Sequence, residues 1–113
     1  MKYVFFLMLR ATPAWLALSR LQRRDIADQH LRPLLAASGD KLTMRYFDAE
    51  AFTADCSDVM MTETADPKLH YYFMEGLRDS PLITVPYFEV VRIVPAIEDG
   101  YEGYEKEGGT PAL

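Results

Sequence analysis

The sequence has little of the chemistry that marks the common catalytic classes. It contains one cysteine, Cys56, and two histidines among 113 residues. A lone cysteine cannot form an internal disulfide, and the spacings CxxC and HxxxH that indicate metal sites are missing. Glycine-rich phosphate loops and serine-nucleophile motifs are also missing. These absences exclude a disulfide-stapled domain, and they predict neither a metal nor a cofactor.

Long hydrophobic runs are missing as well. The longest apolar stretch near the N-terminus, residues 3–9, is only seven residues long and ends at Arg10. This is short for the apolar core of a signal peptide, and a membrane-spanning helix needs about 20 apolar residues. The stretch therefore predicts a strand. Together with the single cysteine, which suits a reducing compartment, it leads us to expect a cytoplasmic protein.

The net charge of −5 is unevenly spread. Residues 1–45 hold eight Lys or Arg against three Asp or Glu, whereas residues 46–97 hold three against nine. Residues 98–113 hold one Lys against five acids. The pI near 4.9 and the lack of a basic, aromatic-rich run argue against nucleic acid and anionic membranes as partners. We expect one domain over residues 1–97, followed by an acidic C-terminal tail, 98–113.

Apolar and β-branched segments alternate with two amphipathic helices along the chain. Ser19 followed by Gln22 is a capping box, and Asp66 before a proline is a favoured helix start. The resulting order is β-α-β-β-α-β, the ferredoxin-like arrangement of an α+β domain, with a four-stranded antiparallel sheet and two helices on one face. The expected strands are 2–10, 41–48, 58–64 and 84–95, and the expected helices are 19–37 and 67–79.

The first strand is apolar on both of its faces. A strand with one solvent-exposed face would instead alternate apolar and polar residues. Two helices cover only one face of the sheet, so the other face needs a cover of its own. A second copy of the sheet is the most economical cover. We therefore expect a homodimer in which two sheets pack together as a dimeric α+β barrel.

Two segments of the first third carry a family resemblance. The stretch Tyr-Val-Phe-Phe-Leu-Met-Leu-Arg-Ala-Thr-Pro-Ala-Trp-Leu at 3–16 and the stretch Ile-Ala-Asp-Gln-His-Leu at 26–31 resemble the darcynin family of small bacterial proteins. The resemblance extends over nearly the whole chain. It implies a compact fold similar to the dimeric α+β barrel proteins, a group that includes cofactor-free monooxygenases, lactone isomerases and haem enzymes. It brings no catalytic residues with it.

His30 and His70 fall on or beside the inward faces of the two expected helices. Two interpretations remain open. In the first, both are structural histidines with ordinary hydrogen bonds. In the second, at least one of them lines a pocket between helices and sheet and acts as an acid, a base or a haem ligand.

Aromatic and arginine side chains offer further candidates for a small-molecule pocket. Trp15, Tyr46 and Tyr72 are candidate apolar walls for a small apolar or aromatic ligand, although such residues also serve as ordinary core. Arg10 lies near a strand end and is a candidate polar contact in the same pocket.

Three arginines crowd the start of the first helix: Arg20, Arg23 and Arg24. Cations oppose the helix dipole there, so they need compensation. One interpretation is an anion site. The favoured one is pairing with the acidic residues 48–58 between the second and third strands, because the topology brings that connection to the same end.

The function that these features favour is binding of a small molecule in a pocket between helices and sheet. A cofactor-independent monooxygenase-like or isomerase-like enzyme is one alternative, and it rests on fold analogy alone. The other is a non-catalytic dimeric interaction module that presents the basic first third and the acidic tail to partners.

Overall fold

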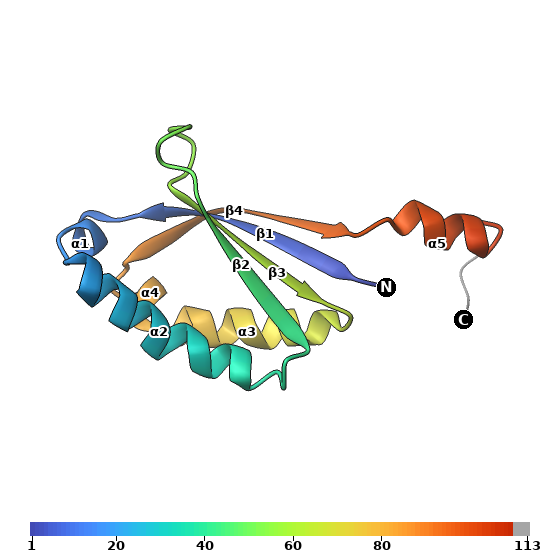
Figure 1. The fold of residues 1–113 in the computed structure, drawn as a ribbon, viewed down its shortest axis with the longest axis horizontal. Coiled ribbons are helices and arrows are strands. Elements are labelled where there is room, and N and C mark those ends of the chain that lie inside the picture. The colour runs from blue at the N-terminus through green and yellow to red at the C-terminus, as the bar shows by residue number, and fades with distance from the viewer. Residues whose placement is uncertain (110–113) are drawn as a thin grey trace.

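The computed structural model describes residues 1–109, and within them it confirms the expected order of the main strands and helices (Figure 1). Short helices also lie at the connections and after the last strand. In chain order the elements are β1 (Tyr3–Ala11), α1 (Pro13–Leu16), α2 (Arg20–Ala36), β2 (Leu42–Asp48), β3 (Asp58–Thr64), α3 (Pro67–Asp79), α4 (Pro81–Thr84), β4 (Phe88–Ile97) and α5 (Gly100–Lys106).

The strands form one antiparallel sheet in the order β2-β3-β1-β4, which places β1 inside the sheet and β4 at an edge. Leu7 of β1 pairs with Met60 on one side and with Ile93 on the other. The register of β1 against β4 shifts between Met8 and Leu9, where a bulge adds one residue to β4. This is the ferredoxin-like arrangement that the sequence predicts.

The helix ends lie where the capping residues place them. The Ser19 hydroxyl accepts a hydrogen bond from the Gln22 backbone N–H at 3.1 Å, and the Gln22 side chain accepts one from Ser19 at 2.9 Å. The Asp66 carboxylate caps α3 by accepting from the Lys68 N–H at 3.0 Å. After α2 the chain turns at Gly39, whose φ of +61° is a conformation that glycine adopts without strain. Local signals therefore fix both long helices.

The start of the fourth strand differs from the prediction. Residues 84–87, which the β-branched composition assigned to the strand, lie in the end of α4 and the turn that follows it. Pro81 occupies the first turn of α4, and the Tyr87 N–H donates back to the Leu82 carbonyl at 3.0 Å. Proline at a helix start outweighs the β-propensity of the next residues. The strand begins only at Phe88 and continues to Ile97.

The core lies between the sheet and the two long helices, which cover one face of it (Figure 1). Side chains from β1, β2, β3, α3, α4 and β4 meet there. Burial of apolar side chains in this layer is the main force that holds the helices on the sheet. The buried cluster consists of Leu7, Leu9, Leu42, Met60, Phe73, Leu77, Leu82 and Phe88.

The opposite face of the sheet carries no helix (Figure 1). Alternation along β1 directs Phe6 and Met8 to this face, and the register places Val94 beside Phe6. Val94 and Phe47 leave 39% and 40% of their surfaces exposed. We call this surface the open sheet face.

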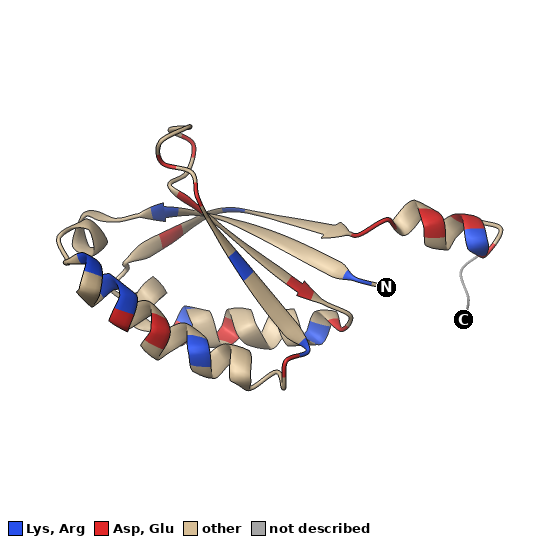
Figure 2. Ribbon diagram, viewed as in Figure 1, with Lys and Arg blue, Asp and Glu red and all other residues tan. Residues whose placement is uncertain are grey.

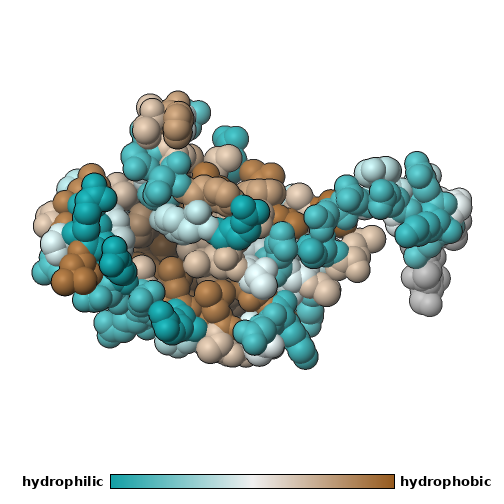
Figure 3. All heavy atoms as spheres, in the orientation of Figure 1, coloured by the Kyte–Doolittle hydropathy of each residue, from teal (hydrophilic) through white to brown (hydrophobic). Residues whose placement is uncertain are grey.

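The acidic segment after β4 extends away from the body at one end of a molecule 54 Å long (Figure 1). It contains the seven-residue α5, and its residues 98–107 are coloured mostly hydrophilic in Figure 3. Lys2 holds its base, with Nζ 3.4 Å from a Glu98 carboxylate oxygen. The last four residues of the predicted tail, 110–113, lie outside the described residues. Within residues 1–109, no helix combines the length and the apolar character that crossing a membrane requires.

Candidate functional site

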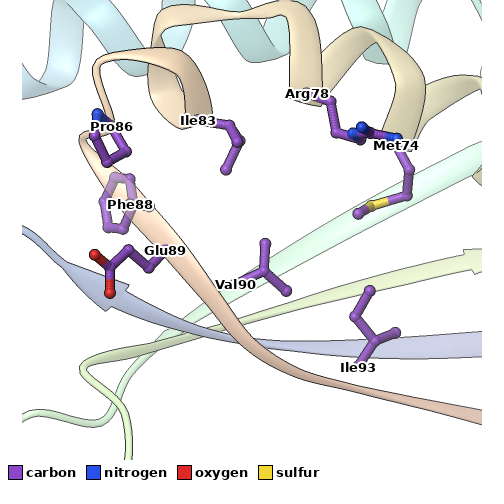
Figure 4. Close-up of a pocket in the computed structure, with 8 residues that line it drawn as sticks. All are labelled: Met74, Arg78, Ile83, Pro86, Phe88, Glu89, Val90 and Ile93. Atoms are coloured by element: carbon purple, nitrogen blue, oxygen red, sulfur yellow. The ribbon is translucent and has the colours of Figure 1, made fainter.

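A shallow, open apolar groove of about 460 Å³ lies between β4 and the end of the α3–α4 segment. That volume lies within the range of small-molecule sites. Figure 4 shows Met74 of α3 directed toward the sheet and Val90 and Ile93 of β4 directed toward the helix. We call this hollow the β4 groove. It is lined by Met74, Arg78, Ile83, Pro86, Phe88, Glu89, Val90 and Ile93.

The groove exists because the helices do not extend over the edge strand. Helix α2 packs against β2 and α3 against β3, while the four-residue α4 is the helix that packs against β4. Phe88 alone in β4 is buried, and Val90 and Ile93 remain 39% and 40% exposed. Apolar side chains on a strand with no helix above them form the floor of the groove.

The near end of the groove is held in place by contacts from α1. The Thr12 backbone N–H donates to the Tyr87 carbonyl at 3.0 Å, and its hydroxyl donates to the Pro86 carbonyl at 2.8 Å. The Trp15 ring packs at 4.7 Å from the Phe88 ring, measured between centroids. Trp15, a predicted ligand contact, therefore lies behind the groove and supports its lining residue Phe88.

The polar groups of the groove lie at its rim. Arg78 lies in the last turn of α3, and one guanidinium nitrogen lies 3.8 Å from a carboxylate oxygen of Glu75. Both side chains are well exposed, so this pair adds little to stability. Glu89 enters from β4 and, in Figure 4, points away from Met74 and Ile93. The groove thus offers an apolar floor with one cation at its edge.

His70 lies in the core, away from the groove. Its ring stacks on Phe5 with a centroid distance of 3.6 Å and an angle of 5° between the planes. Its Nδ1 lies 3.1 Å from the hydroxyl of Thr62, a fully buried residue. Burial lowers the pKa of His70, so the imidazole is neutral near pH 7.

His30 lies half-buried on α2. Neither the β4 groove nor a second hollow, near Met1 and Lys41, includes a histidine among its lining residues. The structure thus does not bring His30 and His70 together around either hollow. A role for either histidine with a ligand remains a prediction from the sequence.

Arg10 faces the connection between β2 and β3. Its guanidinium donates to the carbonyl of Asp55 at 2.7 Å and to that of Ala54 at 3.3 Å. The Ser57 backbone N–H adds a hydrogen bond to the Leu9 carbonyl at 2.8 Å. Arg10 therefore anchors an acidic loop through the loop's backbone rather than through its carboxylates.

Tyr46 lies beside a group of acids at the same end of the sheet. The carboxylates of Asp48, Glu50 and Asp58 fall within 4.8 Å of one another. Burial raises the pKa of Asp58, against the opposing effect of hydrogen bonds from the Ser57 and Tyr46 hydroxyls. Burial and the Asp58 charge raise the pKa of Tyr46 in turn. Asp48 and Glu50 are exposed and Asp58 is half-buried. Carboxylate oxygens are of the type that hard cations prefer, but a cluster of acids alone does not indicate a metal site.

Tyr72 is exposed on the outer side of α3. Its ring lies 6.1 Å from that of Tyr71, and the Lys68 ammonium approaches it at 5.9 Å. Arg10 and Tyr46 therefore lie at one end of the sheet, Trp15 and Tyr72 lie elsewhere, and none of the four lines the β4 groove.

The expected pairing of the α2 arginines with the acidic connection is wrong. Within residues 1–109, none of the ion pairs joins Arg20, Arg23 or Arg24 to residues 48–58. Arg23 instead donates to the carbonyls of Trp15 at 3.2 Å and Leu16 at 2.9 Å. These are carbonyls at the end of α1, where a cation is favoured by the helix dipole.

Sequence reasoning missed the groove residues, among them Ile83, Val90 and Ile93. One signal was available, because the fourth strand is apolar on both faces, like the first. The sequence pattern could not show that the helices would cover β1 and leave β4 uncovered, since that depends on how the helices lie across the sheet.

Solved structures with this arrangement of strands and helices include chlorite dismutases. The structure from Candidatus Nitrospira defluvii in complex with imidazole matches with a TM-score of 0.68 at 10% identity, over 83% of this chain and 38% of that one. A mutant of the same enzyme matches with a TM-score of 0.69 at 11% identity, over 94% of this chain and 46% of that one. The chain spans less than half of each of these proteins. At such identities the likeness establishes the ferredoxin-like α+β fold and no activity.

Sequence comparison defines the family more narrowly. Residues 2–112 match the model of darcynin, a domain of unknown function. Darcynin of Chromobacterium violaceum is 51% identical over 77 residues, which cover 68% of this chain and 96% of that protein. Darcynin 1 of Acinetobacter baumannii is 41% identical over 90 residues, which cover 80% and 99%. The chain belongs to the darcynin family, as the resemblance in its first third predicts.

Proposed function

We propose that this protein binds a small apolar or aromatic molecule in the β4 groove. The observation that carries the proposal is the apolar floor of Val90 and Ile93 under Met74, in a hollow of about 460 Å³. Removing apolar surface from water lowers the free energy by about 25 cal/mol for each Å². A flat apolar ligand that fills the groove removes that surface from water.

Arg78 supports a ligand with an anionic or carbonyl group at one end. Its guanidinium is exposed and only loosely paired with Glu75, so it is free to reorient toward a carboxylate. Small-molecule sites commonly combine apolar walls with a few polar groups that fix orientation. Aromatic carboxylic acids match this combination and are the first class to test.

We also propose that two copies of the chain pair through their open sheet faces. The face presents Phe6, Phe47 and Val94 beside the charged residues Arg45 and Arg92, and apolar side chains gathered on one exposed face mark association sites. Closing the face with a second copy leaves each β4 groove outside the interface.

The ligand proposal is tested by filling the groove. Ile93→Trp places an indole where the ligand would lie, so we expect aromatic acids to bind wild type and to lose at least about tenfold in affinity for this variant. Ile97→Trp is the matched control, because it changes the same residue type on the same face of β4, beyond the groove. Calorimetric titration measures both. Equal affinities for the two variants, or no binding of any aromatic acid to wild type, would contradict the proposal.

A further inference from the structure

The acidic segment after β4 has few contacts with its own chain. We call residues 98–107 the arm. Its tyrosines, Tyr101 and Tyr104, are 62% and 67% exposed, and they lie three residues apart on α5, which places them on neighbouring turns of the helix. The arm carries five acids and one Lys. An exposed helix with paired aromatic side chains among acidic ones is suited to a basic surface with apolar contacts of its own.

Such a surface lies at the opposite end of the molecule. Arg20 and Arg24 are exposed on the first turns of α2, four residues apart and therefore on one side of the helix. Neither has an ion-pair partner within the described residues. Leu16 and Leu21 beside them are 59% and 64% exposed. We call these four residues the arginine corner.

The arm and the arginine corner complement each other in charge and in apolar character. Figure 2 shows acidic residues along α5 at one end of the long axis and basic residues at the start of α2 at the other. The molecule is 54 Å long, so the two surfaces cannot meet within one chain. A contact between them has to join two copies.

We propose that the arm of one copy docks on the arginine corner of a second copy. Because the two surfaces lie at opposite ends, two copies arranged antiparallel about a two-fold axis across the long axis make both contacts at once. This closed arrangement rests on the proposed pairing of open sheet faces, which sets the copies side by side. The β4 groove of each copy competes less well for the arm, since its rim combines Arg78 with the acid Glu89.

Paired cysteines test the contact directly. Cys56 is buried, so wild type serves as the background. We expect the variant with Leu21→Cys and Tyr104→Cys to oxidise to a covalent dimer that persists in denaturing electrophoresis. In the matched control, Leu21→Cys with Phe52→Cys, the second cysteine lies in the exposed β2–β3 connection. Cross-linking no greater than in this control, or a ladder of longer polymers, would overturn the proposal.

Charge reversal provides the second test. We expect Arg24→Glu to weaken self-association about fivefold in sedimentation equilibrium at low salt, and Glu102→Arg with Glu105→Arg in the same chain to restore it. The control, Arg32→Glu, changes the same charge further along α2, where Arg32 pairs with Asp28 at 3.3 Å.

The outcomes separate the two proposals. Equal association of Arg24→Glu and Arg32→Glu, with the wild-type dimer intact, would overturn arm docking and leave the pairing of sheets standing. A wild-type chain that stays monomeric at all concentrations would overturn both. If Arg24→Glu weakens self-association and Glu102→Arg with Glu105→Arg restores it, the result supports docking of the arm on the arginine corner.

Discussion

Leu7 and Ile93 are direct partners on neighbouring strands, on the same side of the same sheet, yet their surroundings differ. Leu7 in β1 is 0% exposed, and Ile93 in β4 is 40% exposed. Both strands are rich in apolar residues. The difference arises from the two long helices, which cover β1 and do not extend over β4. Two apolar strands therefore have different roles: β1 belongs to the core, and β4 offers a candidate binding surface.

The largest effect should come from truncating these two partners. We expect Leu7→Ala to lower the free energy of unfolding by about 3 kcal/mol, because it leaves a cavity in the packed core. Ile93→Ala should cost about 1 kcal/mol, since its side chain is still partly in water. Urea denaturation at dilute protein concentration measures both. Similar losses for the two variants would mean that β4 is covered within a single chain.

The second effect concerns the helix-covered side of the sheet, where His70 lies. We expect the free energy of unfolding to fall at acidic pH because of this residue. Its pKa is lowered by burial, so its contribution to stability is present above the unfolded value near 6.5 and is lost as the pH falls through the lowered pKa. One proton changes the unfolding free energy by at most about 1.4 kcal/mol per pH unit.

Denaturation between pH 7 and pH 5 measures this slope. We expect His70→Gln to reduce it. A slope that persists in His70→Gln would assign the acid sensitivity to another group.

The smallest effect should come from Asp58, the first residue of β3. Its pKa is raised by burial, so this group favours the folded state below its unfolded pKa near 3.8 and loses that contribution as the pH rises through the raised value. At pH 7 the carboxylate therefore costs stability. We expect Asp58→Asn to raise the unfolding free energy by less than about 1 kcal/mol, as solvent screens the partly exposed group. Lower stability of Asp58→Asn at pH 7 would refute this assignment.

Local signals explain how much of the fold could be predicted from sequence. Ser19 with Gln22, Asp66 before a proline, and the apolar strand around Leu7 each specify structure within a few residues, and each prediction is confirmed. The predicted start of the fourth strand was wrong, because Pro81 begins a short helix that includes residues with a high β-propensity. The family assignment also followed from the first third of the chain, and the family match confirms it.

The candidate site was less accessible from sequence because it depends on packing over long separations. Met74 and Ile93 belong to different elements, and they line one groove only because α3 passes beside β4 without covering it. Arg23 shows the same limit, since its hydrogen bonds go to the end of α1 instead of to the acidic connection. A count of charges suggests that groups of opposite sign pair. It cannot predict whether an arginine will bind a nearby carbonyl or a carboxylate.

The central claim is that both exposed faces of β4 are covered from outside the chain, the groove side by a ligand and the open sheet face by a second copy. Hydroxyl-radical footprinting at increasing protein concentration, with the association state followed by sedimentation, tests it most directly. We predict that labelling of Val94 on the open sheet face falls several-fold as copies associate, while buried Leu7 stays unlabelled throughout. Labelling of Val94 that remains constant from the most dilute to the most concentrated sample would contradict the account.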